Sequence, residues 1–138
     1  MVLVMLSLPL NHLKYRKFAS EAKKSNVTDV LLDSLLREFI SLNDDSRQKY
    51  ALGGGLFKLR IATSNGRGKS AGSRSILAFR ENDRLIWLHI FSKNDKGNIT
   101  ENELKKLKTL SKILLELTPD GLQKLISNGE LLEVNKDE

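Results

Sequence analysis

Residues 73–93 read SRSILAFRENDRLIWLHIFSK, which places two segments of alternating side chains on either side of a short polar turn. The segments are 73–80 and 85–93, and Glu81-Asn82-Asp83 separates them. A period of two predicts half-buried β-strands, and a connection this short favours antiparallel pairing. The same alternation occurs upstream in residues 56–62, so we expect three adjacent antiparallel strands.

The three strands distribute their side chains between two faces of one sheet, because neighbouring side chains of a strand point to opposite sides. One face is apolar and must be covered by helices; it comprises Phe57, Leu59, Ile61, Leu77, Phe79, Ile86, Leu88 and Ile90. The opposite face comprises Lys58, Arg60, Arg74, Arg80, Trp87, His89, Phe91 and Lys93. The cations are therefore expected to gather on the side of the sheet that the core does not use.

Helical patterns precede these strands. Residues 13–24 carry an apolar stripe, and a second helix, capped by Asn26 or Thr28, is expected to run to about Leu42. A turn is expected at residues 43–46, where Asn, Asp and Ser cluster.

Further helical patterns follow the strands. Thr100-Glu101-Asn102-Glu103 is a capping box, in which the Thr hydroxyl and the second Glu carboxylate each bond a backbone amide. It opens a leucine-striped helix; Thr118-Pro119 opens a short one that stops near Asn128-Gly129, and residues 131–134 are expected to add an edge strand. The order of elements predicts an α+β fold: a small antiparallel sheet of three to four strands, packed by N-terminal and C-terminal helices.

The composition is typical of one ordinary domain. With 138 residues, 40% hydrophobic and 29% charged, the chain is long enough for a single core and fits a soluble globular protein. It has no cysteine, which excludes a disulfide framework and a thiol nucleophile and fits a reducing, cytoplasmic compartment.

The first ten residues are apolar and are not expected to be a targeting signal. They lack the basic start of a secretory signal and are too short to span a membrane. We expect residues 1–12 to be an apolar N-terminal extension that packs on the domain or adds an edge strand, and residues 13–135 to be a single domain. The alternative is a start chosen too far upstream, with Met5 as the candidate true start.

The net charge of +6 comes from the middle of the sequence. Residues 1–57 carry eight basic and six acidic side chains, and residues 97–138 carry six basic and eight acidic ones, so the two flanks cancel. Residues 58–96 hold nine Lys or Arg against three Asp or Glu. A basic region concentrated in this way indicates a polyanionic partner. A mildly basic domain without such a partner is the alternative.

Residues 66–70, GRGKS, resemble the end of a P-loop but do not meet its requirements. The motif needs a glycine where this chain has Thr63, and it must lead into a helix, whereas a strand is expected to follow. Nucleotide hydrolysis is therefore not expected. We interpret the segment as a basic loop whose backbone amides approach a phosphate, with a plain hairpin loop as the alternative.

The histidines do not support metal chemistry. His12 and His89 are the only two, they lie far apart, and neither has a carboxylate at ligand spacing, so no metal or cofactor is predicted. Phosphate chemistry without a metal remains. RNA carries its own nucleophile, the 2′-hydroxyl, so a protein that cleaves it needs only to align that group, move two protons and neutralise the developing charge.

The basic face offers residues for each of these tasks. Arginine suits charge neutralisation through its planar fork, and a lysine acts as base where neighbouring cations and partial burial lower its pKa. The candidate catalytic residues are Lys58, Arg60, Arg74 and Lys93. The candidate RNA-binding residues are Arg67, Lys69, Arg80, Trp87, His89, Phe91 and Asn94, with Trp87 or Phe91 stacking a base. The alternative is a set of solvated cations beside aromatics packed under a helix.

Six blocks of sequence occur in order along residues 13–135. They are LGGGLFKLRIA (52–62), GRGKSAGSR (66–74), ILAFR (76–80), FSKNDKGNI (91–99), ELKKLK (103–108) and NGELLEV (128–134). Together they resemble toxins of the RelE/ParE superfamily, in the HigB-like branch. The resemblance implies a RelE-type fold and the growth-arresting toxin of a type II toxin–antitoxin system.

The resemblance also implies an activity and partners. Relatives commonly cleave mRNA, often on the ribosome, and are neutralised by a cognate antitoxin that often has a helix-turn-helix domain; operator DNA is contacted only through that complex. By position, Lys58 and Arg60 match the basic pair of the first strand in the family. Arg74 matches the arginine after the glycine, and Lys93 with Asn94 matches the basic end of the third strand.

Two positions depart from the family pattern. Ser73 stands where relatives usually have an aromatic residue, and no tyrosine or histidine follows Lys93, so the general acid is unassigned unless Arg74 or Lys93 serves. Two other functions stay open: a ParE-like toxin that inhibits DNA gyrase by binding, and a non-catalytic RNA-binding domain. Four lysines of the late helix are interpreted as a solvated face; they are Lys105, Lys106, Lys108 and Lys112.

Overall fold

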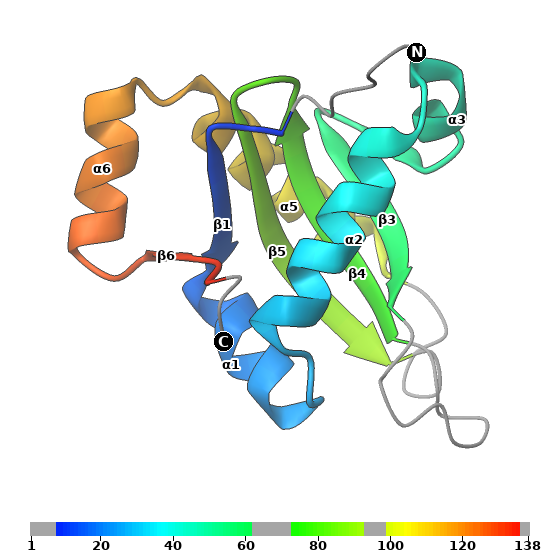
Figure 1. The fold of residues 1–138 in the computed structure, drawn as a ribbon, viewed down its shortest axis with the longest axis horizontal. Helices are drawn as coiled ribbons and strands as arrows, with labels where there is room; N and C mark the ends of the chain where they lie inside the picture. The colour runs from blue at the N-terminus through cyan, green and yellow to red at the C-terminus, as the bar shows by residue number, and fades with distance from the viewer. Residues whose placement is uncertain (1–7, 62–72, 93–98, 136–138) are drawn as a thin grey trace, which may run out of the picture.

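The computed structural model describes residues 8–61, 73–92 and 99–135 (Figure 1). Within these residues the chain forms a six-stranded sheet and five helices. The strands are β1 (Asn11–Tyr15), β2 (Ala51–Gly53), β3 (Leu56–Ile61), β4 (Ser73–Arg80), β5 (Arg84–Ser92) and β6 (Leu131–Glu133). The helices are α1 (Arg16–Lys24), α2 (Asp29–Ser41), α3 (Asp44–Gln48), α5 (Glu101–Glu116) and α6 (Pro119–Ser127). The predicted α+β class is confirmed.

The sheet is larger than predicted and is not purely antiparallel. Its strand order is β2-β3-β4-β5-β1-β6, and β1 runs parallel to β5 while the other neighbouring pairs are antiparallel. The prediction of three to four antiparallel strands is therefore wrong. It misses β2, which is three residues long and pairs across a glycine turn, and β1, which lies in a segment that reads as helical.

Strand β1 replaces the first turn of the expected helix 13–24, and only Arg16–Lys24 is helical. β1 lies between β5 and β6, both of them distant in sequence, and Leu13 at its centre is 1% exposed. Pairing on both sides outweighs the local helical preference. The last two residues of the expected N-terminal extension, Asn11 and His12, belong to this strand and pair with β5.

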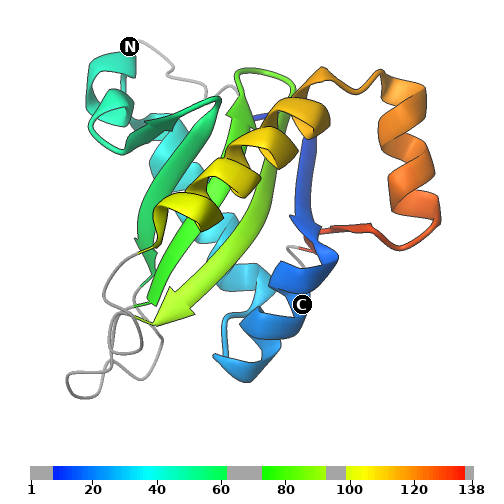
Figure 2. The same cartoon turned by 180° about the vertical axis from the view of Figure 1, so that it is seen from behind.

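Helices cover both faces of the sheet (Figures 1 and 2). Helices α1 and α2 pack on one face, in a core that includes Phe18, Leu32, Leu36, Phe39, Phe57, Leu77 and Trp87. Helix α5 crosses the other face, where a second core includes Leu56, Ile76, Ile86, Leu88 and Leu114. Helix α6 adds Leu122 to the second core beside β1 and β6. The face that sequence alternation left open is therefore partly covered by α5.

A β-bulge at Leu88 decides which face the side chains of β5 occupy. Ile76 of β4 pairs with His89, but the next residue, Leu77, pairs with Trp87, so Leu88 is an extra residue that reverses the alternation. The predicted helix-covered face is confirmed for Phe57, Leu59, Ile61, Leu77, Phe79 and Ile90. It is wrong for Ile86 and Leu88, which lie under α5.

Three helix starts are confirmed by their caps. Thr28 accepts a hydrogen bond from the Leu31 amide (3.1 Å), Thr118 caps α6, and Thr100 forms the predicted capping box with Glu103. The turn expected at residues 43–46 is instead the start of α3, since Asn43 caps that helix. No helix of the described residues is long and apolar enough to cross a membrane.

The glycine turn between β2 and β3 docks on α5. Gly55 has a φ of +82°, and a Cβ there would overlap the Leu115 side chain. The Ser111 hydroxyl donates a hydrogen bond to the Gly54 carbonyl over 2.8 Å. These contacts fix α5 over the β2–β3 side of the sheet.

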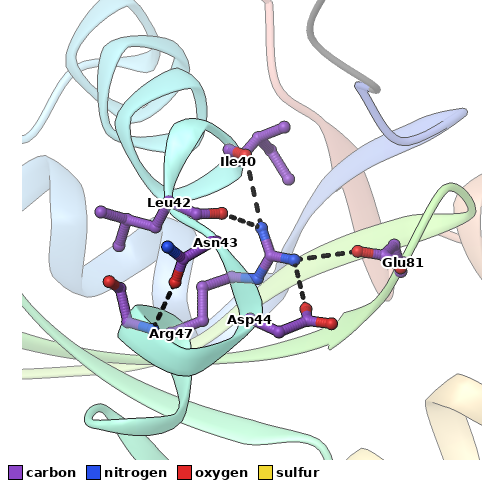
Figure 3. Close-up of polar contacts among 7 residues, drawn as sticks. Ile40, Leu42, Asn43, Asp44, Arg47 and Glu81 are labelled. Carbon is purple, nitrogen blue, oxygen red and sulfur yellow. Dashed lines mark hydrogen bonds and ion pairs between the residues drawn. The ribbon is translucent and has the colours of Figure 1, made fainter.

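A buried arginine joins α2, α3 and the β4–β5 turn (Figure 3). Arg47 donates to the Leu42 carbonyl (2.8 Å) at the end of α2 and forms ion pairs with Asp44 (2.7 Å) and Glu81 (2.9 Å). Its guanidinium also lies 5.6 Å from the centre of the Phe79 ring. Because protein groups occupy its donors, Arg47 has a structural role.

Candidate functional site

Two rows of side chains cross the α5 face of the sheet. The pairing of β3 with β4 and of β4 with β5 defines them. The first row is Lys58, Ile76 and His89, and the second is Arg60, Arg74 and Phe91. Partners on adjacent strands have Cβ atoms about 5 Å apart, so the cations and aromatic rings form a two-row grid. The prediction that Lys58, Arg60 and Arg74 share one face is confirmed; their chemical roles stay predictions.

Arg60 and Arg74 form the most charged part of this grid. They lie directly opposite each other on β3 and β4, and like charges in that position repel. Arg60 is exposed and Arg74 is half-buried. The Nη1 atom of Arg74 is buried and has no hydrogen-bond partner in the described part of the chain. An anion between the two guanidinium groups would offset the repulsion and supply the missing acceptor.

His89 and Phe91 lie beside the two arginines on β5. Their rings stack with centroids 5.6 Å apart and an interplanar angle of 27°. Both side chains are half-buried, and Phe91 also packs against the second core. The pair therefore presents an aromatic surface next to the cations, as predicted for these two residues by their place in the strand.

The prediction that Trp87 contacts RNA is wrong. The bulge at Leu88 turns Trp87 to the opposite face, where it is fully buried and stacks on Phe18 with centroids 5.8 Å apart. Its indole Nε1 donates a hydrogen bond to His12 Nε2 over 2.8 Å. Trp87 is a core residue, and no base can reach its ring.

Arg80 lies on the same face as Arg74 but away from the grid, and its predicted contact with RNA stays a prediction. It ends β4 opposite Arg84, six residues from Arg74, or about 20 Å along a strand. Arg80 donates to the Leu115 carbonyl and pairs with Asp83, while Arg84 donates to the Leu114 carbonyl over 2.8 Å. The two arginines therefore satisfy the carbonyl end of α5.

Four of the predicted site residues lie outside the described residues. They are Arg67, Lys69, Lys93 and Asn94. The described part of the candidate site therefore consists of Lys58, Arg60, Arg74, His89 and Phe91.

The described residues contain no group of three or more His, Cys, Asp and Glu side chains that could hold a metal ion. His12 lies on β1, away from the grid. Burial lowers its pKa from 6.5 to about 4, against the opposing effect of Asp33 and Asp29. A neutral ring agrees with Nε2 accepting the bond from Trp87. What the site offers is anion binding by arginines, a neighbouring lysine and stacked rings.

The chain matches the family described as RelE toxin of RelE / RelB toxin-antitoxin system over residues 11–134. This range begins with β1 and ends just after β6, so it spans the whole sheet. No curated protein matches the chain.

Proposed function

The chain belongs to the RelE toxin family of RelE/RelB toxin–antitoxin systems, and on that premise we propose that it is a metal-independent endoribonuclease. It cleaves mRNA by attack of the 2′-hydroxyl on the adjacent phosphate, free or on the ribosome. A cognate antitoxin, with a helix-turn-helix DNA-binding domain, neutralises it in the cytoplasm. The resemblance of its sequence blocks to the HigB-like branch supports assigning it to that branch.

The chemistry divides among residues of the two rows and Lys93, which lies outside the described residues. Lys58 accepts the proton of the 2′-hydroxyl, which then forms a bond to phosphorus as the bond to the 5′-oxygen breaks. Arg60 and Arg74 bind the non-bridging oxygens, whose negative charge grows in the transition state. Lys93 stabilises charge or protonates the departing 5′-oxygen, and Phe91 holds a flanking base. The products are a 2′,3′-cyclic phosphate and a 5′-hydroxyl.

One observation carries the proposal: Arg60 and Arg74 face each other across β3 and β4, and a buried guanidinium nitrogen of Arg74 has no partner among the described residues. A protein that only needed cations for solubility would leave them in water. An unpaired buried donor costs about 1–3 kcal/mol, which a bound phosphate oxygen would recover. Arg84 Nε is also buried without a partner among the described residues, but Asp83 and the Leu114 carbonyl bind that guanidinium. No acceptor among the described residues binds Arg74, so a ligand is expected there.

The experiment is induction of the wild type and of Arg74→Ala in cells, with growth and RNA 5′ ends mapped together. Wild type is expected to arrest growth and to produce new discrete RNA ends. Arg74→Ala is expected to abolish both, because the transition-state charge loses a bidentate donor. The matched control is Arg37→Ala, which removes an exposed arginine of α2, the helix that packs on the opposite face of the sheet, and should keep both effects.

Other results would redirect the assignment. If Arg74→Ala and Lys58→Ala both stay fully toxic, the proposed active face is wrong. DNA damage without new RNA ends would favour inhibition of gyrase. Harmless wild-type expression would favour a non-catalytic RNA-binding domain.

A further inference from the structure

Helix α5 lies on the same face of the sheet as the two rows. Figure 2 shows it in yellow, running across β3, β4 and β5. Its Leu114 shares the second core with Leu56 and Ile76 of that face, and Ser111 holds the β2–β3 turn. Any strand of RNA that reaches Lys58 and Arg60 therefore passes close to this helix.

Three lysines line one flank of α5. Lys105, Lys108 and Lys112 are separated by three and four residues, which places them on one side of a helix over about 10 Å. Lys108 packs against Gly53 and Gly54, so this flank faces the β2–β3 side of the sheet. It therefore runs along the edge of the face on which β3 carries Lys58 and Arg60.

No described residue neutralises the charge of this flank. Among the described residues, none of the three lysines forms an ion pair. Lys105 and Lys112 are exposed. The acidic side chains on the same flank, Glu101 and Glu116, are the first and last residues of the helix. The middle of the flank is uniformly positive.

We propose that this lysine flank, Lys105, Lys108 and Lys112, binds the phosphate backbone of the RNA outside the scissile position. The inference rests on the proposed function, since it takes RNA as the ligand of the adjoining face. Three ammonium groups in a row, those of Lys105 and Lys112 exposed and that of Lys108 half-buried, do not converge on a single small anion. They suit a polyanion with regularly repeated charges, for which each lysine replaces condensed counterions.

The test measures binding without scission. A fluorescent single-stranded RNA with a 2′-O-methyl group at every position lacks the nucleophile, and its affinity is measured by anisotropy between about 50 and 200 mM salt. In the variant Lys105→Gln/Lys108→Gln/Lys112→Gln, the slope of log affinity against log salt should become shallower by about 2, since each contact contributes about 0.7. Affinity at about 100 mM salt should fall roughly 10- to 100-fold.

Two further variants make the result specific. Lys105→Gln/Lys112→Gln keeps the packing of Lys108 on the glycine turn and should lose about 1.4 of the slope. The control Lys17→Gln/Lys23→Gln/Lys24→Gln removes the same charge from α1, which packs on the opposite face of the sheet, and should keep the wild-type slope. Thermal unfolding of each variant establishes that the fold is intact.

A triple α5 variant with wild-type slope and affinity would overturn the inference and leave the proposed endoribonuclease standing. Equal losses in the α5 variant and the α1 control would also overturn it, because net charge would then be responsible. If the wild type neither binds this RNA nor produces new RNA ends in cells, the proposed function fails and this inference fails with it.

Discussion

The two ends of β4 carry arginines with opposite surroundings. At one end, Arg80 bonds the Leu115 carbonyl and Asp83. Its neighbour Arg84 bonds the Leu114 carbonyl and Asp83, although its Nε is buried without a partner among the described residues. At the other end, Arg74 lies opposite Arg60, and neither arginine has an acidic partner or a carbonyl acceptor among the described residues. The same residue type on one strand is thus part of the scaffold where protein supplies its acceptors. It is available to a ligand where protein does not.

The largest expected effect is at Arg74, which has no acceptor among the described residues. Arg74→Ala should lower the rate of RNA cleavage by roughly 100- to 1,000-fold, the usual loss when one transition-state donor is removed. Its free energy of unfolding should stay the same or rise, because the change removes an unpaired buried donor and a like-charge contact. Cleavage assays and urea denaturation measure the two effects. A large loss of stability would show that Arg74 belongs to the scaffold.

Arg84→Ala should lower the stability of the protein and leave the rate of RNA cleavage unchanged. Arg84 is 1% exposed and donates to the Leu114 carbonyl, so its removal leaves a cavity and a buried acceptor without a partner. The expected loss of stability is about 2–4 kcal/mol, measured by urea denaturation. Cleavage by the folded fraction should be retained. A loss of cleavage in protein shown to be folded would contradict the purely structural role assigned to Arg84.

The hydrogen-bonded pair His12 and Trp87, on the α1–α2 side of the sheet, predicts that stability depends on pH. His12 has a folded pKa of about 4 against 6.5 when unfolded, so between these values the unfolded chain binds a proton that the folded chain does not. Stability should be full above about pH 6.5 and fall toward pH 4, by at most about 3 kcal/mol.

The variant His12→Gln isolates this contribution. Its amide oxygen keeps an acceptor for Trp87 but does not titrate, so the acid-dependent loss should be smaller than in wild type. Urea denaturation at several pH values measures the difference. Equal pH profiles for the two proteins would show that other groups account for the acid sensitivity.

The smallest effect is expected for Arg80, the exposed arginine at the end of β4 that bonds α5. Arg80→Ala removes a partly exposed side chain that bonds the Leu115 carbonyl and Asp83. Because water can replace these contacts, stability should fall by only about 1 kcal/mol. Cleavage should be unchanged. A cleavage defect as large as that of Arg74→Ala would show that Arg80 takes part in RNA binding or cleavage.

Local patterns in the sequence predicted much of the fold. Strand β4 has the predicted bounds, and the capping box at Thr100 and the proline start of α6 are where their residues indicate. Each of these depends on residues only a few positions apart, whose propensities and hydrogen bonds act within one element. The same holds for the shared face of Lys58, Arg60 and Arg74, which follows from alternation in two neighbouring strands.

The errors have non-local causes. Residues 13–15 become a strand because β5 and β6 pair with them from far along the chain, and no local pattern reports this. Trp87 changes face because one extra residue, Leu88, interrupts the pairing with β4. The bond from Arg80 to a helix carbonyl 35 residues away is likewise not visible in any local pattern.

The central claim is that the arginines of β3 and β4 hold the phosphate during cleavage by the 2′-hydroxyl. The direct measurement is the chemistry of the ends that purified protein produces from free RNA in excess EDTA and, in a separate reaction with Mg²⁺, from mRNA on translating ribosomes. Wild type should give a 2′,3′-cyclic phosphate and a 5′-hydroxyl, and Arg74→Ala should give almost no product. Ends with a 3′-hydroxyl and a 5′-phosphate, or equal cleavage by both proteins, would contradict the account.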